Sequence, residues 1–111
     1  RAFTTKFVDA EEVARIFKFN LNAGTHWYRG TWSSLDKIFI SVKGIEKDKI
    51  IPIWNSYDIF ILPEMVRDLD YQDYTTGATQ TFRGVPLRFN DKSGIGFSDH
   101  LPVTMSFYLP E

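Results

Sequence analysis

The stretch GFSDHLPV, residues 96–103, places an acid and an imidazole side by side, Asp99 and His100, directly before a strongly apolar run. A carboxylate can hold a divalent cation, and an imidazole can accept a proton from an attacking water. Gly94 and Gly96 precede the pair and let the backbone approach a ligand closely. Taken alone, such a pair is more often a turn acid and a hydrogen-bonded histidine than a site of catalysis.

A second stretch, WSSLDKIFIS at 32–41, adds the carboxylate of Asp36 at the predicted start of a strand over 35–42. If the starts of this strand and of the one after His100 lie at the same edge of a sheet, Asp36 can orient the imidazole. An imidazole held by a carboxylate at one nitrogen has its tautomer fixed and presents the other nitrogen to a reacting group. We therefore expect Asp36 and His100 to meet.

Composition excludes several other chemistries. The chain has no cysteine and two histidines, so a zinc site of familiar ligand spacing has little to draw on. The glycine-rich nucleotide loops, the GxSxG elbow and the HExxH motif are absent. Lys+Arg 13 against Asp+Glu 14 gives a net charge of −1, which provides no global basic field for nucleic acid but leaves a local basic patch open. No apolar run approaches the ~20 residues that span a bilayer.

The elements that must position these residues are predicted from patterns. Asp9 reads as the N-cap of a helix over about 10–18, with Glu12 able to return a bond to the cap. The apolar face of this helix should comprise Val13, Ile16 and Phe17. With 111 residues, 43% of them hydrophobic, the chain is predicted to form a single domain over 1–111.

Strands are expected at 35–42, 57–62 and 101–109, the last from its strict alternation of apolar and polar residues. Residues 25–32 could be a short strand and turn or a surface loop. Residues 67–83 lack a clear period and are predicted to be a long loop. Trp54 and Phe60 are expected in the core.

The motif W-x-x-L-D-x-I-x-I-S followed by G-[FY]-S-D-H-L-P-V resembles the C-terminal part of the endonuclease/exonuclease/phosphatase superfamily, the DNase I-like proteins. The resemblance covers about residues 24–42 and 82–109. It implies an α/β (α+β) fold that is half of a two-layer α/β sandwich, with a mostly antiparallel sheet and a flanking helix.

The resemblance also implies roles. His100 would activate water or stabilise charge on the phosphoryl group, Asp36 would pair with His100, and Asp99 would contact a divalent metal, Mg²⁺ or Mn²⁺. The implied reaction is hydrolysis of a phosphodiester or phosphomonoester, nuclease-like or on a small molecule or lipid headgroup. The substrate side would be lined by Trp32, Arg29 and Tyr28.

One departure from the family pattern limits this expectation. The first half of the family fold supplies an asparagine, a metal-binding glutamate and a G-D-x-N motif, and none of these is found in the 111 residues. We therefore expect a C-terminal portion that lacks its N-terminal half, is inactive alone, and could self-associate through the exposed seam. The alternative is a binding or assembly module that retains the fold without chemistry.

Several single residues keep two interpretations. His26 could contact substrate, or it could be a structural or exposed histidine. Arg29 could bind phosphate or form a surface ion pair. Arg83 and Arg88 could form a positive rim near the SDH motif, although solvated charges are the simpler expectation.

Overall fold

The computed structural model describes residues 6–110, and their contacts divide them into two compact units. Unit 1 contains the chain up to Leu21, residues Lys37–Asp58 and the chain from Val103 onward. Unit 2 contains residues Asn22–Asp36 and Ile59–Pro102. Each unit is described by itself below.

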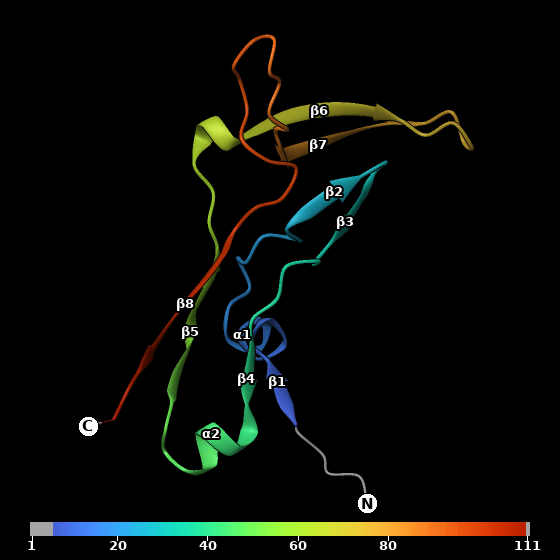
Figure 1. The fold of residues 1–111 in the computed structure, drawn as a ribbon. Helices are drawn as coiled ribbons and strands as arrows, with labels where there is room; N and C mark the ends of the chain where they lie inside the picture. Colours follow the sequence, from blue (N-terminus) through green and yellow to red (C-terminus); the bar gives the residue numbers. More distant parts are fainter. Residues whose placement is uncertain (1–5, 111) are drawn as a thin grey trace, which may run out of the picture. The chain divides into compact units, whose positions relative to one another are not determined.

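Unit 1 is built from two short pairs of strands and two helices (Figure 1). Strand β1 pairs antiparallel with β4, with Val8 opposite Ile40. Strand β5 pairs with β8 in a second two-stranded sheet. The elements of unit 1 in chain order are β1 (Phe7–Asp9), α1 (Ala10–Phe17), β4 (Phe39–Ser41), α2 (Val42–Glu46), β5 (Ile51–Ile59) and β8 (Val103–Tyr108).

Unit 2 is built from two antiparallel hairpins. In the first hairpin Trp27 lies opposite Trp32, and in the second Leu69 lies opposite Phe82. The Trp27 ring packs edge-on against Tyr71 and Phe82, with ring centroids 5.5 and 5.2 Å away. The elements of unit 2 are β2 (His26–Tyr28), β3 (Thr31–Ser33), the 3₁₀ turn η1 (Pro63–Met65), β6 (Val66–Gln72) and β7 (Thr79–Pro86).

The predicted α+β class is confirmed, since mostly antiparallel strands in small sheets occur with two helices in the described part of the chain. None of the described helices is long and apolar enough to cross a membrane. The finer expectation, half of a two-layer sandwich forming one domain over 1–111, stays a prediction.

Helix α1 begins where the sequence predicts, but it buries a different face. The backbone N–H of Glu11 donates to the Asp9 carboxylate at 2.9 Å, which is the expected N-cap. The apolar face predicted for the helix is not its buried face, because Ile16 and Phe17 are 68% and 61% exposed. The buried side chains of the helix are instead Ala10, Glu11 and Ala14.

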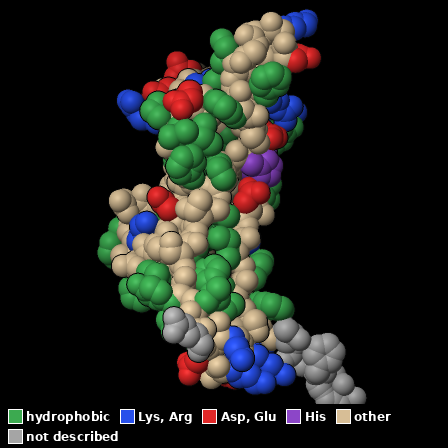
Figure 2. Space-filling view, turned by 60° about the vertical axis from the view of Figure 1, so that its left-hand side comes forward, with side chains coloured by type: hydrophobic (Ala, Val, Ile, Leu, Met, Phe, Trp, Pro, Cys, Tyr) green, Lys and Arg blue, Asp and Glu red, His purple; other side chains and the backbone are tan. Residues whose placement is uncertain are grey.

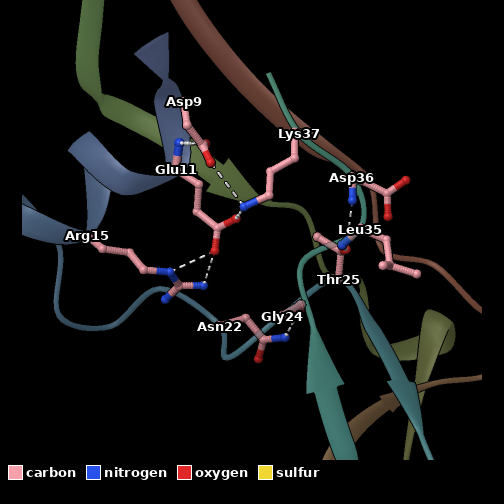
Figure 3. A network of polar contacts seen from close by, with 9 residues as sticks. All are labelled: Asp9, Glu11, Arg15, Asn22, Gly24, Thr25, Leu35, Asp36 and Lys37. Carbon is pink, nitrogen blue, oxygen red and sulfur yellow. Dashed lines mark hydrogen bonds and ion pairs between the residues drawn. The ribbon is translucent and has the colours of Figure 1, made fainter. Parts of the chain in front are cut away.

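The buried face of the helix includes the acid Glu11, which is only 4% exposed. Its polar contacts are drawn in Figure 3. Its carboxylate binds the Arg15 guanidinium at 2.7 Å and the Lys37 ammonium at 3.0 Å, and Lys37 also binds Asp9 at 3.1 Å. Burial alone would lower the pKa of Lys37, but hydrogen bonds to Glu11 and Asp9 outweigh it, so the pKa is raised. A buried acid needs such partners, and Arg15 and Lys37 supply them on this face of the helix.

Two of the predicted segments are wrong in the middle of the chain. The strand expected over 35–42 is reduced to β4, because residues 34–38 precede the strand and Ser41 caps helix α2 by accepting from the Gly44 N–H. The loop expected over 67–83 is the hairpin β6–β7. The strands of this hairpin are mostly exposed and rich in polar residues. Apolar and polar residues therefore do not alternate clearly along them, and the pattern that predicts a strand is weak.

Other predictions fare better. The last strand is β8, inside the expected range, and the strand expected over 57–62 coincides in part with the longer β5. Residues 25–32 are a strand, a turn and a second strand. Trp54 is half-buried, whereas the core prediction for Phe60 is wrong because 43% of it is exposed.

Unit 1 exposes many large apolar side chains. Figure 2 shows hydrophobic side chains gathered in several surface clusters on the face in view. Six aromatic residues of unit 1 are each at least half exposed: Phe7, Phe17, Phe19, Phe39, Phe107 and Tyr108. Self-association through such a surface stays a prediction.

Tyr57 gives unit 1 a measurable alkaline sensitivity. It is fully buried, and its hydroxyl has no hydrogen-bond partner among residues 6–110. Burial, with the nearby carboxylates of Glu11 and Asp9, raises the pKa of Tyr57 to about 12. An unfolded tyrosine loses its proton at about pH 10. Stability is therefore complete below that pH and falls as the pH rises towards 12, because only the unfolded chain gains from ionisation.

We predict that Tyr57→Phe weakens this alkaline loss and leaves stability at neutral pH unchanged or higher by about 1 kcal/mol, because a buried unpaired hydroxyl is removed. Urea unfolding at several pH values measures both effects. Tyr108→Phe, at a 64% exposed position, is the matched control. An alkaline loss in Tyr57→Phe equal to that of the unaltered chain would contradict the assignment.

Candidate active site around His100

Thr25 joins the segments that build the site. This residue is fully buried. Its N–H donates to the Ser33 carbonyl at 3.0 Å, and its own carbonyl accepts from the Leu101 N–H at 2.7 Å. Its hydroxyl oxygen accepts from the backbone N–H groups of Leu35 and Asp36, at 3.2 and 3.3 Å (Figure 3). Thr25 thereby holds the chain at Asp36 and the chain next to His100 in one place.

The hairpin β2–β3 brings His26 to the same place. Arg29 and Gly30 both have positive φ, 48° and 86°, as a two-residue primed turn requires. At the other end of β2, His26 forms an antiparallel bridge with His100, and their ring centroids are 4.8 Å apart. The two histidines of the chain are therefore neighbours.

The contact expected between Asp36 and His100 is present. Asp36 Oδ2 lies 2.7 Å from His100 Nδ1, although the residues are 64 positions apart. The two side chains are 38% and 37% exposed, so His100 stays within reach of a ligand. Asp36 does not stand at a strand start as predicted, since β4 begins only at Phe39 and Asp36 is held instead by Thr25.

Asp99 contacts Arg88 and His26, whereas the adjacent His100 contacts Asp36. Oδ2 of Asp99 lies 3.0 Å from Nη2 of Arg88 and 4.0 Å from Nε2 of His26. The hydrogen bond from Arg88 lowers the pKa of Asp99. The solvated Arg88 expected from the sequence is exposed but paired with this acid.

The predicted substrate residues occupy two faces of the hairpin. Tyr28 is 60% exposed and its ring is 6.4 Å from that of His26, so both lie on one face of β2. The Arg29 guanidinium lies over the Tyr28 ring at 5.2 Å. Trp32 lies opposite Trp27, and strand alternation puts this pair on the other face from His26. Contacts of Tyr28, Arg29 and Trp32 with substrate stay predictions.

Sequence reasoning missed Thr25, the pairing of Arg88 with Asp99, and the approach of His26. A threonine before an aromatic strand carries no local signal of burial, and an ion pair across 11 positions in irregular chain has no periodicity. The signal that could have found His26 was its place at the start of a short hairpin with a Tyr-Arg-Gly-Thr turn.

The potential metal ligands around Asp99 suit ions that bind imidazole nitrogen better than they suit Mg²⁺. In the described part of the chain, one cluster of three or more potential ligands is present, and it comprises His26, Asp99 and His100. Mg²⁺ prefers six oxygen ligands in octahedral geometry. A single carboxylate, already engaged by Arg88, does not build that site from these residues.

We predict that Thr25→Val loosens the site. Valine keeps the branched shape but leaves two backbone N–H groups without their acceptor, which should lower the free energy of unfolding by roughly 1–2 kcal/mol. Amide hydrogen exchange at Leu35 and Asp36 should become faster. Thr25→Ser, which keeps the hydroxyl, is the control. Unchanged protection of both amides in Thr25→Val would contradict the role assigned to the hydroxyl.

A pair of glycines before the SDH motif provides a second prediction. Gly94 and Gly96 both have positive φ, so alanine is strained at either, by about 1 kcal/mol. A Cβ at Gly96 would overlap the carbonyl oxygen of Arg88, whereas a Cβ at Gly94 meets open space. Gly96→Ala should therefore lower the free energy of unfolding more than Gly94→Ala and shift the His100 imidazole signals in NMR spectra. Equal effects of the two substitutions would show that close approach is unimportant.

Comparisons of the chain with protein-family models, with curated proteins and with solved structures find no match.

Proposed function

We propose that this chain contributes the proton-accepting side of a phosphoester-hydrolysing site, as the C-terminal part of a metal-dependent phosphoesterase. The observation that carries the proposal is the 2.7 Å contact between His100 Nδ1 and Asp36 Oδ2, made by residues from distant parts of the sequence. The motifs around them are those that resemble the DNase I-like proteins.

In this proposal His100 is the catalytic residue and Asp36 is a positioning residue. With its Nδ1–H donating to Asp36, the imidazole keeps the Nε2 lone pair free to accept a proton from water. Attack of that water on phosphorus would form a new P–O bond and place the proton of the water on Nε2, while the ester P–O bond breaks and the leaving oxygen takes a proton from solvent. The carboxylate of Asp36 would stabilise the imidazolium that forms. General base catalysis of this kind contributes about 10²–10⁴ to a rate.

The proposed substrate is a phosphodiester or phosphomonoester. The guanidinium of Arg29 and the exposed ring of Tyr28 are the proposed contacts, because a guanidinium fork matches phosphate oxygens. A net charge of −1 does not favour long duplex DNA, so a small phosphoester or a lipid headgroup is preferred over nucleic acid.

Mg²⁺ or Mn²⁺ belongs to the proposal for the complete enzyme, with Asp99 as the contributing residue from this chain. The remaining oxygen ligands, which in the family come from the other half of the fold, would be supplied by another segment of polypeptide. For this reason we expect the 111 residues to be inactive alone.

The test is hydrolysis of a chromogenic phosphodiester with Mg²⁺ or Mn²⁺. It compares this chain, the chain joined to the coding sequence that precedes it in its gene, and His100→Ala and Asp36→Asn in the longer protein, with Asp91→Asn as a matched surface control. We expect activity in the longer protein, a loss of about 10²-fold or more in His100→Ala, and a smaller loss in Asp36→Asn. Equal activity with and without His100, or none in any form, would overturn the proposal.

A binding or assembly module is the second candidate. The exposed aromatic side chains of unit 1, such as Phe39 and Tyr108, favour it because soluble proteins rarely expose large apolar patches without a partner. Absence of activity in every form, with a stable folded chain, would support this candidate.

A further inference from the structure

The two histidines of the chain, His26 and His100, lie next to each other in the folded chain. His26 and His100 form a backbone bridge, and Leu101 next to His100 donates to the Thr25 carbonyl at 2.7 Å. This backbone pairing holds both imidazoles on the same part of unit 2. Asp99, adjacent to His100, adds a carboxylate.

We propose that His26, Asp99 and His100 form a binding site for Zn²⁺, with water as the fourth ligand. One ligand atom from each of the three residues lies within 4.8 Å of the other two. Around tetrahedral zinc, with bonds of about 2.0–2.1 Å, ligand atoms are about 3.3 Å apart. Side-chain rotations can close the difference, because the backbone already sets the three residues side by side.

The surroundings of His100 favour a metal ligand. Asp36 occupies Nδ1 at 2.7 Å, so Nε2 is the nitrogen left for an ion. Zinc-bound histidines almost always donate their other ring N–H to a carboxylate or carbonyl, which fixes the tautomer and raises the basicity of the ligand nitrogen. Asp36 supplies this carboxylate contact to His100, and Asp36 is not one of the three proposed ligands.

The chemistry of the donors selects the ion. Two imidazoles and one carboxylate match zinc and other late first-row ions, whereas Mg²⁺ requires oxygen ligands. The side chains of His26, Asp99 and His100 are 19%, 41% and 37% exposed, so an ion can reach them from solvent.

Arg88 is the internal competitor for this site. Its guanidinium holds Asp99 at 3.0 Å but is itself 78% exposed, so the ion pair is weak and can be exchanged for a metal bond. Removing Arg88 should therefore tighten metal binding, whereas removing any ligand should weaken it.

Occupancy by Zn²⁺ would take up the lone pair of His100 Nε2. Bound Zn²⁺ would therefore inhibit hydrolysis. This inhibition rests on the proposed function, in which the same lone pair accepts a proton from water. Zinc binding itself does not depend on activity and can be tested without it.

The test is a titration of the chain with Co²⁺, a spectroscopic substitute for Zn²⁺, followed by displacement with Zn²⁺. We expect one equivalent of Co²⁺ to give the visible absorption of four-coordinate cobalt, to broaden the NMR signals of both imidazoles, and to resist excess Mg²⁺. His26→Phe keeps a ring against His100 but removes the nitrogen, and should weaken binding by at least about 10- to 100-fold.

Three further variants sharpen the result. Asp36→Asn should weaken Co²⁺ binding about 10- to 100-fold through the outer contact, and Arg88→Met should tighten it by up to about fivefold. Asp91→Asn, in an exposed loop of the same unit, should leave binding unchanged. Binding of equal strength in His26→Phe, or absence of the four-coordinate spectrum in the folded unaltered chain, would overturn the proposal. Loss of phosphodiesterase activity alone would leave the metal result standing.

Discussion

The site depends on one buried residue, Thr25, whose three polar groups all find partners in different segments. Its N–H meets Ser33, its carbonyl meets Leu101, and its hydroxyl meets the backbone at Leu35 and Asp36. A buried polar group left without a partner is costly, so these contacts form together or the segments separate. The meeting of an acid and an imidazole from distant parts of the chain follows from this constraint.

The same contacts explain why the site could serve either proton transfer or metal binding. Asp36 binds one nitrogen of His100, while His26 and Asp99 approach the imidazole from the hairpin and from the adjacent backbone position. An oriented imidazole with one free nitrogen can accept a proton or bind a metal ion. A metal ion bound to that nitrogen excludes proton acceptance there. Arg88 forms an ion pair with Asp99 and lowers the pKa of that carboxyl, and a metal ion would have to compete with Arg88 for it.

Unit 1 combines a buried ion-pair network with many exposed apolar side chains. Glu11 is buried with Arg15 and Lys37 as partners, and this network lies on the face of α1 that also buries Ala10 and Ala14, while Ile16 and Phe17 are exposed. Buried ion pairs are weak sources of stability but strongly specify which groups must be near one another. The buried face of the helix is therefore the one that carries the charge network, and it differs from the apolar face that hydrophobic periodicity predicts.

Local signals in the sequence determined the start of α1 at the Asp9 cap, the strand β8, the mixed α and β class, and the two acids and the imidazole that belong to one candidate site. Capping and strand alternation depend on neighbouring residues, so the sequence contains them directly. Only the tertiary structure decided the hairpin β6–β7, whose exposed strands lack apolar alternation, and the shortening of the strand expected over 35–42. It also decided that His26 joins His100, because that approach depends on the backbone bridge between them and on the hydrogen bond from Leu101 to Thr25, partners that no spacing along the chain reveals.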